Sequence, residues 1–313
     1  MAHVSEHRSP LNCTALPQGA TLAILRPRER SAEQLRPTRH NLTVLTTDFD
    51  VAAYTQAEPQ PIAVEAPDLV LNPQQVLMLR YLREVLATEL DDMRAMLTSW
   101  TGHEARITAF LATWAVERYW STRALRDLLE LASAPAAKLP AASRHPVQHR
   151  LASAYNARIL PLAGSVTGTL VGEPITAGHM ARMAVNQALL TTATHSALLQ
   201  LPTAARTPLQ QVCDRQEIAF QFFAAEATAR IQRSRAERTS ADLHLRWPWR
   251  PLLRNGLPIA GETQAITALF GPQEARRHLL RAELSVTQNL RSRRSPATAL
   301  VRRHVNPHSE RAS

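Results

Sequence analysis

Apolar side chains recur every three or four positions along residues 73–100, which is the spacing of one face of an α-helix. The residues of this stripe are Leu79, Leu82, Leu86, Leu90, Met93, Leu97 and Trp100. Asn72 and Pro73 form a typical helix start, because an Asn side chain caps free backbone N–H groups and proline suits the first helical position. Gly102 is a typical end. The sequence therefore predicts a long amphipathic helix whose apolar face is buried against other elements.

Further patterns of the same kind follow along the chain. They predict long helices over 103–134, 177–200 and 207–234, and shorter ones over 147–159, 261–269 and 272–290. Proline and glycine interrupt them in the linker 135–146, in the loop 161–176, and at Pro202 and Pro208. Glycine is scarce, at nine of 313 residues, which also favours helix. The prediction is an all-α fold, an antiparallel four-helix bundle with extra shorter helices.

The composition changes at both ends of the chain. Residues 1–70 contain loop-like proline segments, and residues 291–313 are rich in Arg with few apolar side chains to bury. We therefore expect three parts: a mostly disordered leader over 1–70, the helical bundle over 71–290, and a disordered Arg-rich tail over 291–313.

The formal net charge of +10 raises the question of nucleic-acid binding. Lys138 is the only lysine, and the arginines are scattered except in the tail, so solvated helix faces explain the charge better than a nucleic-acid groove does. A basic face could equally meet an acidic protein. The sequence has no apolar run long enough to span a membrane and no secretory signal, and Cys13 and Cys213 lie far apart. These features favour a cytoplasmic protein.

Several motifs of catalysis are missing from the sequence. It has no glycine-rich phosphate loop, no G-x-S-x-G and no C-x-x-C. Lys138 lies in an Ala/Pro linker and is a poor candidate for a Schiff base. Nucleotide-fold enzymes, α/β-hydrolases and lysine chemistry are therefore not indicated.

Two segments carry longer motifs. The segment 114–129 reads W-A-V-E-R-Y-W-S-T-R-A-L-R-D-L-L. It resembles the W-T-A-E-E-N-R-H-G-x-A-L-R-D-Y-L segment of the acyl-carrier-protein desaturases, a family of the ferritin-like superfamily. Residues 209–213, L-Q-Q-V-C, resemble the L-A-Q-I-C that opens the family's fourth core helix. The resemblance covers roughly residues 73–234. It implies a ferritin-like bundle, a homodimer, and a chemistry based on two iron ions.

Such a diiron site takes one Glu from each of two helices and a Glu-x-x-His pair from each of the other two. In the register of the resemblance, the positions are Glu89 in the first helix, Arg118 and Ser121 in the second, Gln187 in the third, and Phe220 and Phe223 in the fourth. Only the first carries a family ligand. None of the twelve histidines has a Glu three residues before it. We therefore expect no metal and no cofactor.

The replacements suggest how the centre of the bundle is filled. The guanidinium of Arg118 would repel a metal cation, and Phe220 and Phe223 would fill the hole with apolar rings. A buried Arg needs a partner, and Glu89 is our candidate. We expect Glu89, Arg118, Gln187 and Phe220 to converge at the middle of the bundle, with Ser121 and Phe223 one turn away.

Other candidate residues favour ordinary structural roles. Trp114 and Trp120 are better explained as core aromatics than as a radical path, and Cys213 as a small buried thiol. Glu274 and His278 lie one turn apart, but without a third ligand they are a helix-surface pair rather than a metal site.

Two functions remain open on the sequence alone. The first is a degenerate desaturase-like bundle, a binding or scaffold protein linked to fatty-acid or secondary metabolism, with an acyl carrier protein or a long-chain apolar ligand as its partner. The alternative is an active diiron acyl-carrier-protein desaturase or oxygenase whose ligands lie elsewhere. Whether the chain is an enzyme therefore stays undecided here.

Overall fold

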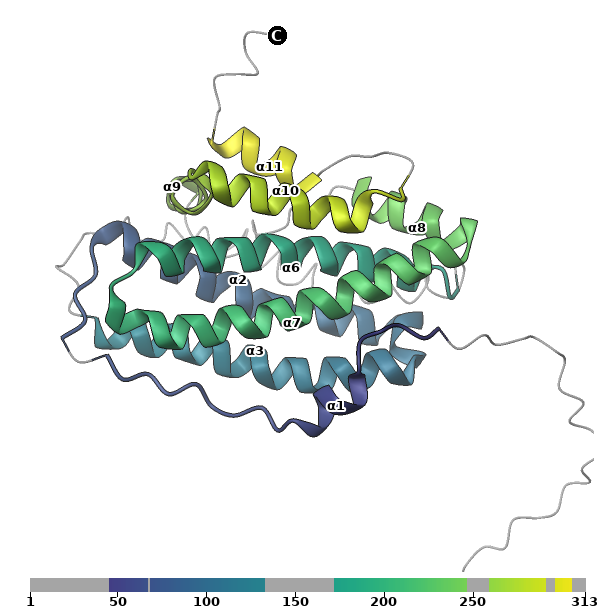
Figure 1. Cartoon of the computed structure of the whole chain (residues 1–313), viewed down its shortest axis with the longest axis horizontal. Helices are drawn as coiled ribbons and strands as arrows, with labels where there is room; N and C mark the ends of the chain where they lie inside the picture. Colours follow the sequence, from purple (N-terminus) through teal and green to yellow (C-terminus); the bar gives the residue numbers. More distant parts are fainter. Residues whose placement is uncertain (1–44, 67, 133–171, 247–258, 291–295, 306–313) are drawn as a thin grey trace, which may run out of the picture. The chain divides into compact units, whose positions relative to one another are not determined.

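The structure is a computed structural model that describes residues 45–66, 68–132, 172–246, 259–290 and 296–305. The regular elements of this described part are helices, which confirms the predicted all-α class (Figure 1). They belong to one unit, Leu45–Ser313. The linker 135–146 and the helix expected over 147–159 lie outside the described residues.

The first long helix begins where the sequence predicts. α2 (Pro73–Leu97) is capped by Asn72, whose side chain accepts from the backbone N–H of Gln75 at 2.9 Å, while the Gln75 side chain accepts from the backbone N–H of Asn72 at 2.9 Å. A short 3-10 turn, η1 (Trp100–His103), leads into α3 (Ala105–Leu131). A Cβ atom at Gly102 would collide with the carbonyl oxygen of Leu97, so this tight turn requires glycine.

The second pair of long helices is the most buried part of the chain. α6 (Ile175–Gln200) and α7 (Thr203–Arg233) are joined by two residues and pack side by side along their lengths (Figure 1). Pro208 lies inside α7, so the predicted break at this proline is wrong. The proline falls in the second turn of the helix, on its buried side, where its missing N–H removes only one backbone hydrogen bond.

Four shorter helices follow. α8 (Arg235–Arg246) packs against α6, and the contact is so close that a Cβ atom at Gly178 would collide with the ring of His244. α9 (Ile259–Phe270) contacts α2, and α10 (Gln273–Thr287) contacts α6. α11 (Pro296–Val305) packs against α9 and α10. In Figure 1, α10 and α11 lie along the opposite side of α6 from α3.

The structure moves both expected domain boundaries. Residues 45–66, which we assigned to the leader, include α1 (Val51–Gln56) and bury Val51 and Ile62 against the bundle. At the other end, α11 lies in the expected disordered tail and buries Ala297 and Val301. Both segments carry a few apolar side chains, and these suffice once a neighbouring helix provides the other half of the contact.

Candidate functional site

Three polar side chains from three helices meet in the core: Glu89 of α2, Arg118 of α3 and Gln187 of α6. Nη1 of Arg118 lies 3.4 Å from Oε2 of Glu89, which confirms the predicted pairing. Nη2 of Arg118 donates to Oε1 of Gln187 at 3.1 Å, and Nε2 of Gln187 donates to Oε1 of Glu89. Each side chain therefore contacts the other two. We call these three residues the polar triad.

The triad is closed to solvent. Glu89 is 3% exposed, Arg118 1% and Gln187 0%. Burial raises the pKa of Glu89 to about 7, although the Arg118 charge and the hydrogen bond from Gln187 lower it. The guanidinium also lies over the ring of Trp114, with 5.1 Å from its carbon to the ring centroid. Trp114, which the sequence indicates as a core aromatic, thus forms one wall of the site.

The other three expected positions do not join the triad in the same way. Ser121 Oγ donates to the backbone oxygen of Glu117 in its own helix at 2.7 Å. The ring of Phe223 packs edge-on against Trp114, with 5.7 Å between centroids. Phe220 lines a cavity between α6, α7 and α10. Phe220 is partly buried beside the core side of α7, which includes Gln216, Ala219 and Phe223, and its convergence with Glu89 stays a prediction.

The polar triad does not fit a diiron centre. Iron in such sites needs several carboxylate and imidazole ligands. The triad supplies one carboxylate and one amide, and its third member is a guanidinium that stays protonated in proteins. Among the described residues, no group of three or more His, Cys, Asp or Glu could hold a metal ion.

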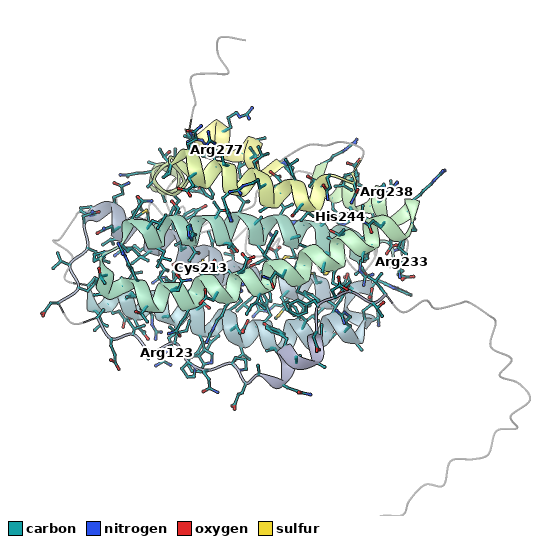
Figure 2. All side chains as sticks on the ribbon, viewed as in Figure 1. Arg123, Cys213, Arg233, Arg238, His244 and Arg277 are labelled. Atoms are coloured by element: carbon teal, nitrogen blue, oxygen red, sulfur yellow. The ribbon has the colours of Figure 1, made fainter. Side chains whose placement is uncertain are left out.

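A second buried network, which the sequence analysis missed, links α3, α7 and α8. Arg230, 1% exposed, lies 3.2 Å from Glu226 and 2.5 Å from Glu104, measured from Nη2 to the carboxylate oxygens. Arg233, at the end of α7 in Figure 2, pairs through Nε with Glu237 of α8 at 2.8 Å. In the sequence, Glu226 with Arg230 and Arg233 with Glu237 are ordinary pairs spaced by four residues, like those on a solvated helix face, and the distant Glu104 gives no signal at all.

The residues that the sequence analysis set aside lie in different surroundings. Cys213, labelled on α7 in Figure 2, is a buried free thiol, as the sequence predicts. Burial raises its pKa to about 11, so it is a weak nucleophile. Trp120 is only half-buried, with Arg123 over its ring, so its predicted place in the core is wrong. Glu274 and His278 are exposed, and His278 contacts Thr192 of α6.

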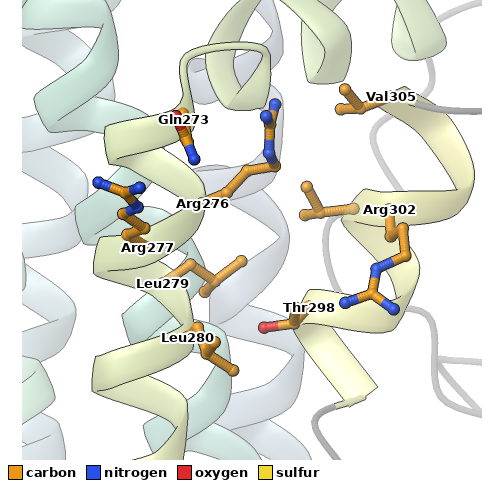
Figure 3. A pocket seen from close by; sticks show the side chains of 9 residues that line it. Gln273, Arg276, Arg277, Leu279, Leu280, Thr298, Arg302 and Val305 are labelled. Carbon is orange, nitrogen blue, oxygen red and sulfur yellow. The ribbon is translucent and has the colours of Figure 1, made fainter.

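Two cavities flank α10. The first lies between α10 and α11 and has a volume of about 240 Å³ (Figure 3). Its lining combines apolar side chains with Gln273, Thr298 and three arginines, Arg276, Arg277 and Arg302. Arg276 donates to the backbone oxygens of Phe270 and Gly271, and Arg277 points away from the cleft in Figure 3. The second, also about 240 Å³, lies between α6, α7 and α10.

Comparisons of the chain with protein-family models, with curated proteins and with solved structures give no match. Within the described part of the chain, no helix has the length and apolar character needed to cross a membrane.

Proposed function

We propose that this chain is a non-catalytic helical bundle that binds a partner or a ligand, and that its centre is closed by the polar triad instead of a metal. The observation that carries the proposal is the mutual contact of Glu89, Arg118 and Gln187, one from each of three core helices. These positions correspond to three ligand positions of the desaturases that the sequence resembles. A guanidinium there provides the positive charge that a metal would otherwise supply to the carboxylate.

The proposal accounts for the joint change of these residues. Several buried carboxylates need metal or protons to offset their repulsion and desolvation. With Arg118 in place of the metal, its single positive charge balances one carboxylate. Gln187 supplies both a hydrogen-bond donor and an acceptor without adding charge. The result is a stable core with no site where oxygen could be activated.

The partners belong to the same proposal and are supported by the resemblance. They are an acyl carrier protein or a long-chain apolar ligand, within fatty-acid or secondary metabolism, and a second copy of the chain in a homodimer. The rival is an active diiron desaturase or oxygenase.

Iron loading of the purified chain tests the proposal. The protein is incubated with ferrous iron under reducing conditions, desalted and analysed for bound metal, with a diiron protein treated in parallel as the control. We expect no stoichiometric iron and no desaturation of acyl carrier protein substrates. The double change Arg118→Glu and Ser121→His should not create binding, because α6 and α7 still supply no ligand. Two irons per unmodified chain would overturn the proposal and support the rival.

A further inference from the structure

The cavity between α6, α7 and α10 is lined by a mixed set of side chains. Its apolar wall consists of Ala188, Phe220 and Ala282, and its polar lining of Thr191, Glu217, His278, Arg281 and Ser285. With a volume of about 240 Å³ it is smaller than the pockets of about 300–1,000 Å³ that hold drug-sized ligands, so its ligand must be small.

The cavity carries one negative and one positive side chain. Glu217 of α7 and Arg281 of α10 form no ion pair within the described part of the chain, with each other or with another residue. A ligand with a single charge would be attracted by one of them and repelled by the other. A ligand with both charges would satisfy both.

His278 adds a hydrogen-bond acceptor beside Glu217. Thr192 donates its hydroxyl proton to the backbone oxygen of Ala188 at 2.8 Å, so its oxygen accepts from Nδ1 of His278 at 3.0 Å. The proton is thereby placed on Nδ1, and Nε2 is left with a free lone pair. Partial burial of the ring lowers the pKa of His278, and His195 and Arg281 lower it further against the opposing charges of Glu217 and Glu274, which favours the neutral ring.

Thr191 provides a hydrogen-bond donor, its side-chain hydroxyl, where His278 provides an acceptor. It is 5% exposed, and its hydroxyl has no hydrogen-bond partner among the described residues. A buried polar group without a partner destabilises the fold, and a ligand in this cavity could satisfy the Thr191 hydroxyl. Ser285 does not compete for this role, since its hydroxyl donates to the backbone oxygen of Ala282 at 2.7 Å.

We propose that this cavity binds a small zwitterion of the α-amino-acid class. Glu217 and Nε2 of His278 accept from the ammonium group, Arg281 and the hydroxyl of Thr191 donate to the carboxylate, and an aliphatic side chain packs on Phe220. The inference rests on the proposed binding function and deepens it by naming a ligand class, and the lining of the cavity shares no residue with the polar triad.

Calorimetric titration of the full chain with three related probes tests the charge requirement. L-norleucine carries both charges, its methyl ester only the positive one, and N-acetyl-L-norleucine only the negative one. We expect norleucine to bind, and each blocked compound to bind about tenfold more weakly or worse, because each loses a charge-assisted hydrogen bond. The proposal would be overturned if norleucine did not bind at about 10 mM, a concentration above the dissociation constants typical of metabolites. It would also be overturned if a blocked compound bound as tightly as norleucine.

Matched variants assign the contacts. Glu217→Gln should weaken the binding of norleucine more than that of the N-acetyl compound, which has no ammonium group. Arg281→Gln should weaken the binding of norleucine more than that of the methyl ester, which has no carboxylate. The controls Asp214→Asn and Arg277→Gln, one turn earlier on the same two helices and outside the cavity, should leave all three affinities unchanged. Altered affinities in the controls, or unchanged affinities in the cavity variants, would refute the site.

Thr191→Val separates binding from folding. Removal of an unpartnered buried hydroxyl should leave the melting temperature of the ligand-free chain unchanged or raise it, while norleucine affinity falls. A variant that melts lower and binds norleucine as well as the parent would show a structural role and contradict the proposal. The iron measurement is independent of these titrations, so the two proposals can fail separately.

Discussion

At the scale of single residues, the two charged members of the polar triad, Glu89 and Arg118, respond differently to the loss of the other. A buried carboxylate that loses its partner can take up a proton, whereas a guanidinium cannot release one. Glu89→Met should therefore lower the free energy of unfolding by about 3–5 kcal/mol, because Arg118 is left buried and charged. Arg118→Met should cost less, since Glu89 becomes neutral. Urea unfolding at pH 7 measures both changes.

The double variant Glu89→Met, Arg118→Met provides the control for this prediction. Two apolar side chains of similar volume leave no unpaired charge, so the double variant should be more stable than Glu89→Met alone. Simple addition of the two single losses would show that the pair is not coupled and would contradict the contact seen between Nη1 of Arg118 and Oε2 of Glu89.

The raised pKa of Glu89 predicts a pH dependence of stability. Its folded value of about 7 lies above the ordinary value of 4.5, so the folded chain binds more protons than the unfolded chain between these limits. The free energy of unfolding contributed by Glu89 is therefore fully present below pH 4.5 and is lost as pH rises through 7. Denaturant unfolding across this range should show a steeper decline for the parent than for Glu89→Gln; identical slopes would contradict the raised pKa.

At the scale of helices, the sequence predicted which long helices exist better than it predicted where the helical bundle begins and ends. The periodic apolar stripes of α2 and α3 identify long helices because each buries one side, whereas α6 is buried on nearly all sides. The pairing of Arg118 with Glu89 was also predictable, since a buried Arg requires a partner. The cavity that Phe220 lines was not predictable, because a register taken from a resemblance does not show how α10 packs beside α6 and α7.

The short helix α11 shows why the tail was misassigned. The carboxylate of Glu283 in α10 accepts from the backbone N–H groups of Ala297 and Thr298 at 2.8 and 3.0 Å, and from the Thr298 hydroxyl at 2.8 Å. It thus caps α11 from another helix. Capping signals in a sequence are local, so a cap provided 14 residues away along the chain cannot be read from it.

Deletion of residues 291–313 should therefore destabilise the bundle. Glu283 is 0% exposed and would lose its donors, and the apolar contacts of Ala297 and Val301 would be lost with them. We expect a cost of about 3 kcal/mol, which lowers the melting temperature by roughly 5–10 °C for a chain of this size. Glu274→Ala, an exposed change on the same helix, should have no effect. An unchanged melting temperature after the deletion would mean that the tail does not stabilise the bundle.

At the scale of the whole molecule, the segment 45–66 acts as part of the core. Phe49 packs against Phe110 and Phe222, with ring centroids 5.7 and 5.3 Å apart. Nη2 of Arg106 donates to Oγ1 of Thr47 at 2.6 Å and to the backbone oxygen of Phe49 at 2.5 Å. The segment therefore joins the aromatic core to the buried charges around Glu226, since Arg106 also pairs with that residue at 2.9 Å.

Two truncated chains test this boundary. A chain that begins at residue 68 loses the Phe49 ring, the buried Val51 and Ile62, and the hydrogen bond from Tyr54 to Glu117, which is 2.5 Å long. Glu117 would be left half-buried without its donor. The cost should be at least about 3 kcal/mol, since burying one large apolar side chain alone contributes roughly 1.5–3 kcal/mol. A chain that begins at residue 45 keeps all these contacts. We expect the shorter chain to melt several degrees lower in a calorimetric scan; equal melting temperatures would mean that the bundle begins near residue 70 after all.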